Sequence, residues 1–305
     1  MTTVSRFEQP TIGTTGPKPR QVSLNPVGLK ERDKALAPLP IPKNARDIGQ
    51  CIYCGIKDIP LSTEHAVPFG LHGTWTLLNA SCKSCADKTS FFEKDTLSSL
   101  YGHIRNVLAM RTRHRKKRPT TLPLIVEPDK LNSVQVPLAE FPLHLPIPVF
   151  APPGIIMNML PSPGIILSDI KLLHIAGPSF KATQERIGRE FAGEHLTFSP
   201  ELFARTLAKI AYCVGIYILG LSPFKNSPVR QIILGENLCL GHWIGSWNGT
   251  AMNNSKGPFA AKVLANGSEI HVVLRLFAQF NTPEYHVVLG EADPKFVNSP
   301  EWPWK

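Results

Sequence analysis

The spacing of hydrophobic residues separates one irregular segment from several segments with clear strand or helix patterns. Residues 1–47 contain many prolines and basic residues, and their hydrophobic positions follow no sustained period. A segment of this kind cannot bury enough apolar surface to offset the entropy lost when it orders. We therefore expect residues 1–47 to be a disordered, proline-rich basic arm, which either adds weak phosphate contacts or is a simple tail.

Residues 48–118 follow a pattern that predicts two strands and then a helix. The stretches TEHAVP and TWTLLNASC are typical of short strands, and a proline-limited turn ends the first of them. After Cys85 the apolar positions recur at helical spacing and fall largely on one face. These positions are Phe91, Phe92, Leu97, Leu100, Ile104 and Leu108. The predicted order is strand, loop, strand, helix.

The remaining sequence predicts a second unit of mixed structure. Residues 119–165 are rich in proline, which favours short edge strands and connections over a long helix. The start of a helix is predicted at Ser199, which can act as the N-terminal cap. Pro200 suits the first helical position, and Glu201 complements the positive end of the helix dipole. Its buried face comprises Leu207, Ile210, Val214 and Ile218. The alternating stretches HVVLRLFAQF and YHVVLG predict a β-hairpin, and we expect residues 166–305 to form an α+β accessory domain of unassigned role.

The charge balance points to a polyanionic partner. The chain has 33 Lys and Arg against 23 Asp and Glu, with a pI near 9.4. No amphipathic basic helix of the membrane-surface type stands out, so we expect DNA, with RNA as the alternative, and no membrane. The N-terminus lacks the apolar run of a signal peptide, and the apolar window IAYCVGIYILGL is too short to cross a bilayer. We expect a cytoplasmic protein, and the sequence does not predict its oligomeric state.

Four of the six cysteines form two Cys-x-x-Cys pairs. Cys51 and Cys54 are separated from Cys82 and Cys85 by 27 residues. Both sulfurs of such a pair can reach one ion, so two pairs complete a tetrahedral zinc site of four thiolates. This site leaves no open position for substrate, which predicts a structural role for Zn²⁺. The alternative is a set of reduced thiols that hold no metal or have a redox role.

An acid and a histidine, Glu64 and His65, lie between the two cysteine pairs. The stretches CIYCG, EHAVPFGLHG and LLNASCKSC, followed by a helix, resemble the HNH endonucleases, in the zinc-bearing subgroup with paired Cys-x-x-Cys knuckles. The resemblance covers about residues 50 to 95. It implies an α+β protein in which a ββα-metal module with a four-cysteine zinc site, residues 48–118, precedes a mixed helix and sheet domain.

The resemblance also implies roles for the matching residues. Glu64 would bind a catalytic Mg²⁺ or Mn²⁺ ion, and His65 would be the general base that activates water. Successive residues on a strand point in opposite directions, so one can hold the ion while the other faces the water. Asn79 matches the middle Asn of the family pattern, which fixes the position of the base by a hydrogen bond. It is also a common turn residue near a strand end.

The third family position, normally His or Asn, is Ala86 in this chain. Alanine cannot bind a metal, so the pattern is incomplete. Asp87 is next in the chain and Glu93 lies about two helical turns beyond Ala86, where it can share the same face. Both are candidate ligands of the catalytic metal. Without such a replacement the chain would be a non-cutting relative of the family.

A dense basic run, RTRHRKKRP, lies at the end of the predicted helix. Such a density of like charge favours non-sequence-specific, salt-sensitive phosphate contacts, and the alternative is a solvated helix end. The candidate nucleic-acid-binding residues are Arg111, Arg113, Arg115, Lys116, Lys117 and Arg118. The leading hypothesis is a metal-dependent HNH-type endonuclease that hydrolyses phosphodiester bonds of DNA. The alternative is a non-catalytic zinc-ribbon protein that binds nucleic acid or has a regulatory role.

Overall fold

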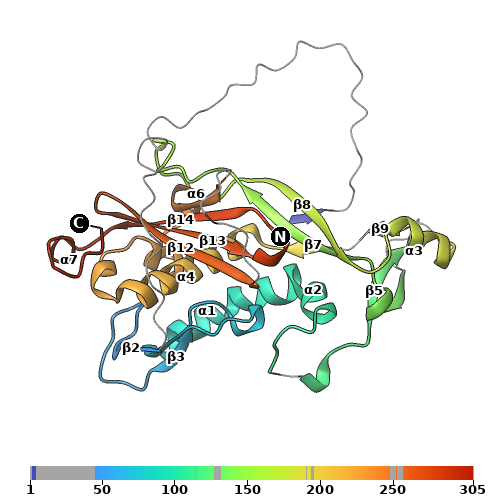
Figure 1. Ribbon diagram of the computed structural model, residues 1–305, viewed down its shortest axis with the longest axis horizontal. Coiled ribbons are helices and arrows are strands. Elements are labelled where there is room, and N and C mark those ends of the chain that lie inside the picture. The colour runs from blue at the N-terminus through green and yellow to red at the C-terminus, as the bar shows by residue number, and fades with distance from the viewer. Residues whose placement is uncertain are drawn as a thin grey trace, which may run out of the picture.

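The computed structural model shows a chain of mixed helix and sheet (Figure 1). It describes residues 2–4, 45–113, 115–126, 132–189, 191–193, 196–247, 252 and 257–304. Most of the predicted basic arm therefore lies outside the described residues. Within them, the α+β class expected from the sequence is confirmed.

The N-terminal part has the predicted order of strand, strand and helix. Strand β3 (Ser62–His65) pairs antiparallel with β4 (Thr76–Ser81), and β2 (Arg46–Asp47) joins the other edge of β4 in parallel. Helix α1 (Lys83–Asp95) follows one residue after β4. This order alone does not establish an HNH module.

The predicted single helix after Cys85 is divided into three parts. Helix α1 passes into a π-helical turn at Thr96–Leu100, and α2 (Gly102–Val107) follows it. Leu100 and Ile104 are buried together with Phe92, as a common face requires, whereas Phe91 is exposed and departs from that face. Neighbouring residues on a helix point about 100° apart, and the core accepts only one of these two rings.

Helix α4 (Pro200–Leu219) is the centre of the C-terminal half. Its N-terminus has the predicted cap, because the Ser199 side chain accepts a hydrogen bond from the N–H of Leu202 and Pro200 occupies the first turn. At Gly215 a Cβ atom would come within 2.8 Å of Leu289, so glycine permits the close approach of the sheet. In the described part of the chain, α4 is the one helix with the length and composition of a membrane span, and 78% of its apolar window is buried.

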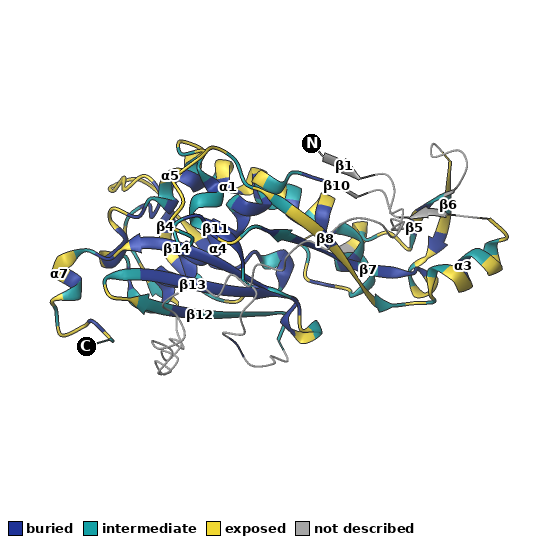
Figure 2. Cartoon of the chain, turned by 90° about the horizontal axis from the view of Figure 1, so that it is seen from above, coloured by how far each residue is buried: buried dark blue, intermediate teal, exposed yellow. Residues whose placement is uncertain are grey.

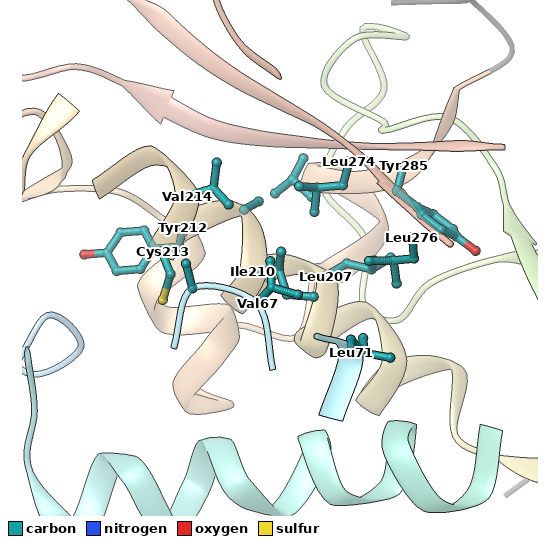
Figure 3. Packing of buried hydrophobic residues seen from close by; sticks show 14 of the residues in the cluster. Val67, Leu71, Leu207, Ile210, Tyr212, Cys213, Val214, Leu274, Leu276 and Tyr285 are labelled. Carbon is teal, nitrogen blue, oxygen red and sulfur yellow. The ribbon is translucent and has the colours of Figure 1, made fainter. Parts of the chain in front are cut away.

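A four-stranded antiparallel sheet with the order β11-β14-β13-β12 lies on one side of α4, and α1 lies on the other (Figure 1). Its strands are β11 (Ile244–Trp247), β12 (Phe259–Asn266), β13 (Glu269–Leu276) and β14 (Glu284–Glu291). The β13–β14 pair confirms the predicted hairpin. Figure 3 shows Leu207 and Ile210 of α4 between Leu71 below and the sheet above. Helix α4 is thus the middle layer of the molecule.

The segment between α2 and α4 forms ribbons at one end of the molecule (Figure 2). Strands β5, β6 and β7 confirm the short strands predicted within residues 119–165, although the predicted boundary after residue 165 falls inside the β7–β8 hairpin. The elements are β5 (Thr121–Val126), β6 (Ser133–Pro137), β7 (Leu143–Phe150), β8 (Leu167–Ala176), α3 (Phe180–Ile187) and β9 (Phe191–Gly193). The short elements elsewhere are β1 (Thr2–Val4), β10 (Leu196–Phe198), α5 (Val229–Leu234), α6 (Leu240–Trp243) and α7 (Pro294–Val297).

The buried side chains form one continuous hydrophobic cluster that extends from Cys51 to Trp302. Helix α4 joins its two parts because it is apolar around nearly its whole circumference and therefore buries opposite faces. The cysteine-containing segment, residues 51–85, and the C-terminal half thus share a core, even though the sequence pattern suggested separate units. This shared core determines how the candidate site is built.

Candidate functional site

The four cysteines of the two Cys-x-x-Cys pairs converge on one point. Their sulfur atoms all lie within 4.8 Å of one another, and the Sγ atoms of Cys54 and Cys82 are 3.7 Å apart. A tetrahedron with Zn–S bonds of about 2.3 Å has sulfur atoms about 3.8 Å apart, so the spacing fits zinc. Cys51, Cys82 and Cys85 are buried, while Cys54 is exposed. This cysteine cluster has the geometry to hold a metal ion such as zinc.

Local backbone geometry explains the convergence. In the first pair, the N–H of Gly55 donates to the carbonyl of Cys51, and Gly55 adopts φ +81°, a conformation that favours glycine. In the second pair, Cys82 is the N-terminal cap of α1 and Cys85 lies in its first turn. The positive end of the α1 dipole favours thiolates at these two positions.

The first cysteine pair is anchored to the C-terminal half through its backbone. Arg230 on α5 donates two hydrogen bonds to the carbonyl of Tyr53, with distances of 3.0 and 2.8 Å. The hydroxyl of Tyr212 on α4 donates to the carbonyl of Ile52 at 2.9 Å. Both carbonyls belong to the turn between Cys51 and Cys54, so α4 and α5 hold the metal-binding turn through its backbone.

A second cluster of charged groups lies between β3, α1 and α4. The ammonium Nζ of Lys209 on α4 lies 2.7 Å from a carboxylate oxygen of Glu64 and 2.7 Å from one of Glu93. It also donates a hydrogen bond to the backbone carbonyl of His65. The side chain of Lys209 is 0% exposed, whereas those of Glu64 and Glu93 are 10% and 20% exposed. We call Glu64, Glu93 and Lys209 the carboxylate–lysine cluster.

The charges of this cluster stabilise one another. Burial by itself lowers the pKa of Lys209, but the two nearby carboxylates outweigh that effect and raise it above its usual value. Burial raises the pKa of Glu93, and Lys209 opposes that rise. An unpaired charge at this depth would cost several kcal/mol, so each group depends on its partners.

The family resemblance implied a catalytic Mg²⁺ or Mn²⁺ ion bound by Glu64 and Glu93. The carboxylate–lysine cluster does not fit such an ion. The ammonium of Lys209 already lies at hydrogen-bonding distance from both carboxylates that would be the metal ligands. A divalent ion would have to approach the same oxygens to about 2.1 Å, next to a positive charge. Glu64 and Glu93 are thus brought together, but around a cation that the chain supplies.

His65 lies at the exposed rim of this cluster. It is partly buried, and its ring contacts the ring of Phe69 edge-on at a centroid distance of 6.0 Å. The guanidinium of Arg111 lies over the same Phe69 ring, 5.7 Å from its centroid. Burial lowers the pKa of His65, and the positive charges of Lys209 and Arg113 lower it further against the opposing effect of Glu64. His65 is therefore neutral at pH 7, as a general base requires.

Asn79 was expected to hydrogen-bond near His65, and Asp87 was expected to bind the catalytic metal. Both have other partners in the structure. The side-chain amide of Asn79 donates to Asp47 of β2 at 3.0 Å, and β-sheet pairing aligns His65 with Thr76, three residues from Asn79. Asn79 has φ +49°, which accommodates the irregular pairing between β3 and β4. Asp87 is exposed and pairs with Lys83 one turn earlier on α1. Neither residue is placed at the carboxylate–lysine cluster.

The basic run follows a helix end and does not continue the helix. Helix α2 ends at Val107, and Ala109 with φ +51° redirects the chain. The basic run therefore does not lie at a helix end, where the sequence pattern placed it, and the alternative of a solvated helix end does not apply. Four of the predicted residues are exposed, Arg118 is turned inward to the carbonyl of Met110, and the Arg115 side chain lies outside the described residues. The exposed four are Arg111, Arg113, Lys116 and Lys117.

Lys209 is the residue that the sequence patterns did not assign to the site. Its signal was present, since it is the one cation in the apolar run from Thr206 to Leu219, between Thr206 and Cys213 at helical spacing. Thr206 lies 2.8 Å from the hydroxyl of Thr96, and Cys213 lies 3.5 Å from the hydroxyl of Tyr53. The three residues form a polar stripe on α4 that faces the cysteine-containing segment. A buried polar stripe of this kind indicates partners on a neighbouring element.

The structure therefore contains a cysteine cluster with the geometry of a zinc site, a carboxylate–lysine cluster and a partly exposed histidine with a basic rim. The charged residues come from β3, α1, α4 and the loop after α2. Comparisons of the chain with family models, with curated proteins and with solved structures found no match.

Proposed function

We propose that the chain binds nucleic acid on the face around His65 and hydrolyses a phosphodiester bond there, as a zinc-stabilised relative of the HNH endonucleases. The observation that supports this most is the combination of a neutral, accessible His65 with Arg111 and Arg113 beside it. Cations at the rim attract a phosphate, and a neutral histidine can accept a proton from water.

In the proposed reaction His65 is the general base. It removes a proton from a water molecule while the water oxygen bonds to phosphorus, and the bond between phosphorus and the leaving sugar oxygen breaks. Solvent returns a proton to that oxygen. The guanidinium groups of Arg111 and Arg113 balance the charge that develops on the phosphate. Lys209 keeps β3 in place through the carbonyl of His65 and the carboxylate of Glu64.

A metal-dependent form of this reaction, with Glu64 and Glu93 binding Mg²⁺ or Mn²⁺, is what the family resemblance implies. The position of Lys209 argues against it, so no step of the proposed reaction uses such an ion. Ala86 at the third family position argues in the same direction.

A second candidate function is nucleic-acid binding without cleavage. Lys209 and Ala86 favour it, because both remove features that a metal-dependent HNH site needs. In this alternative the exposed cations of the basic run bind phosphate, and the zinc site holds the surface in shape.

Cleavage of plasmid and single-stranded DNA tests the proposal. The zinc-loaded protein is incubated in metal-depleted buffer, alone and with added Mg²⁺ or Mn²⁺. We expect nicking that His65→Ala abolishes and that the matched variant His174→Ala, at an exposed position on β8, retains. Zinc content and circular dichroism must be the same for all three proteins.

The possible outcomes separate the candidates. Retained DNA binding without any cutting supports the non-catalytic alternative and refutes the hydrolase. Cutting that needs an added divalent ion and is lost in both Glu64→Gln and Glu93→Gln supports the metal-dependent form instead.

A further inference from the structure

We infer that the ammonium of Lys209 is a built-in cation that takes the place of a divalent metal ion, and that removing it converts Glu64 and Glu93 into a site for Mn²⁺ or Mg²⁺. The first support is the set of atoms around Nζ. Two carboxylate oxygens at 2.7 Å and the carbonyl oxygen of His65 surround it. An ammonium has three N–H groups, and three oxygens are present.

The second support is the enclosure of the cation. Lys209 is 0% exposed and lies in the middle of α4, a helix whose neighbours on both sides belong to the hydrophobic core. A flexible surface lysine could swing aside to admit an ion, but the fully buried Lys209 would have to break its contacts with three oxygen atoms to do so. The ammonium is therefore a fixed part of the cluster.

The third support is the charge balance. The two carboxylates and one ammonium sum to one negative charge within the described cluster. Without Lys209, two carboxylates with nearly buried side chains would face each other, together with a backbone carbonyl. Oxygen donors of this kind are the ligands that Mg²⁺ and Mn²⁺ prefer, and like charges at short distance need a counter-cation. This inference does not depend on whether the site hydrolyses anything.

Mn²⁺ binding to the zinc-loaded full chain tests the inference, with free Mn²⁺ measured by electron paramagnetic resonance. We expect the wild type to bind no Mn²⁺ at this cluster. Lys209→Met removes the charge and keeps an unbranched side chain of similar size. We expect it to bind Mn²⁺ roughly tenfold or more tightly than the same variant with Glu93→Gln added, since a repelling charge is lost and both carboxylates remain. The double variant Lys209→Met with Glu93→Gln is the matched control and should lose that binding.

Binding of Mn²⁺ by the wild type that Glu64→Gln abolishes would overturn the inference. So would a Lys209→Met variant that keeps its zinc and its fold but does not bind Mn²⁺. If Lys209→Met folds only when Mn²⁺ is present, the ion is replacing the ammonium and the inference is supported. If that variant does not fold under any condition, the wild-type measurement decides, because Glu64-dependent binding there is excluded by the inference.

Discussion

The cysteine cluster and the carboxylate–lysine cluster lie along the same helix but differ in the source of their cation. Cys82 and Cys85 are at the start of α1, whereas Glu93 is near its end, about 12 Å further along at 1.5 Å per residue. The first cluster has the geometry to take a zinc ion from solution. The second contains Lys209, which belongs to α4.

The zinc ion and Lys209 would each cross-link parts of the chain, but the parts that they join are different. A zinc ion bound by four cysteines would join two parts of one short segment, residues 51–85, to each other. Lys209 instead joins that segment to a helix more than a hundred residues later in the chain. One cluster makes the segment rigid, and the other fixes it to the rest of the molecule.

The largest effect should come from removing a thiolate of the cysteine cluster. We expect the purified chain to contain one zinc ion, and Cys82→Ser to lose it together with the fold of residues 51–85. Structural zinc sites contribute on the order of 10 kcal/mol to folding at pH 7, so the loss should be severe. Zinc analysis and thermal unfolding measure it. Cys239→Ser, outside the cluster, is the control, and equal behaviour of the two variants would refute a zinc site.

Removal of the internal cation should have the next largest effect. Lys209→Met leaves two carboxylates without a partner, and breaking a buried ion pair costs about 3–5 kcal/mol. Denaturant unfolding should show this loss, and Lys88→Met on the exposed side of α1 should not. Adding Glu64→Gln and Glu93→Gln to Lys209→Met should recover part of the stability. A triple variant no more stable than the single one would show that packing, not charge, is responsible.

A smaller effect concerns a pair of buried histidines, His271 and His286. The Nε2 atom of His286 lies 3.0 Å from Nδ1 of His271, which in turn pairs with Glu269, and burial lowers the pKa of His286 to about 3. Because this folded-state value lies below the unfolded value of about 6.5, the unfolded chain binds more protons between them. Stability contributed by neutral His286 is present above about pH 6.5 and is lost as the pH falls towards 3, by at most about 1.4 kcal/mol per pH unit.

Unfolding free energies of the wild type and His286→Gln, measured from pH 7.5 to 4.5, test this expectation. The wild type should lose stability more steeply on acidification, because the variant lacks the titrating ring. Acid also protonates the cysteine cluster in both proteins, so the difference between the two curves is the quantity of interest. Parallel curves would contradict the expectation.

The smallest effect should come from the surface. Arg111→Ala and Lys116→Ala should each weaken DNA binding about equally for all sequences, by roughly 1 kcal/mol or less, and reduce the salt dependence by about one counterion. Fluorescence anisotropy at several salt concentrations measures both quantities. Lys181→Ala on the distant α3 is the matched exposed control. An effect of Lys181→Ala equal to that of Arg111→Ala would indicate a response to net charge alone.

The sequence predicted the features that depend on local pattern. The two cysteine pairs, strands β3 and β4, the capped start of α4 and the β13–β14 hairpin all follow from residue spacing over a few positions. The break between α1 and α2 was missed because a π-helical turn has no clear signal in hydrophobic periodicity.

The partners of the charged residues could not be predicted in the same way. Asp87 and Glu93 looked equally suitable near Ala86, and only the packing of α4 against α1 decides that Glu93 meets Glu64. Lys209 is 145 residues from Glu64 in sequence, so no local pattern connects them. Tertiary packing determines such contacts, and short-range patterns do not record it.

The hydrogen bond from Lys209 to the carbonyl of His65 has a consequence for how the protein is made. During synthesis β3 and α1 leave the ribosome well before α4, so Glu64 and Glu93 have no ammonium partner until Lys209 has emerged. A fragment that ends at residue 118 would lack both Lys209 and the face of α4 against which α1 packs. The carboxylate–lysine cluster can therefore be completed only after the chain has passed residue 209, although every residue of the predicted nuclease-like unit is already present by residue 118.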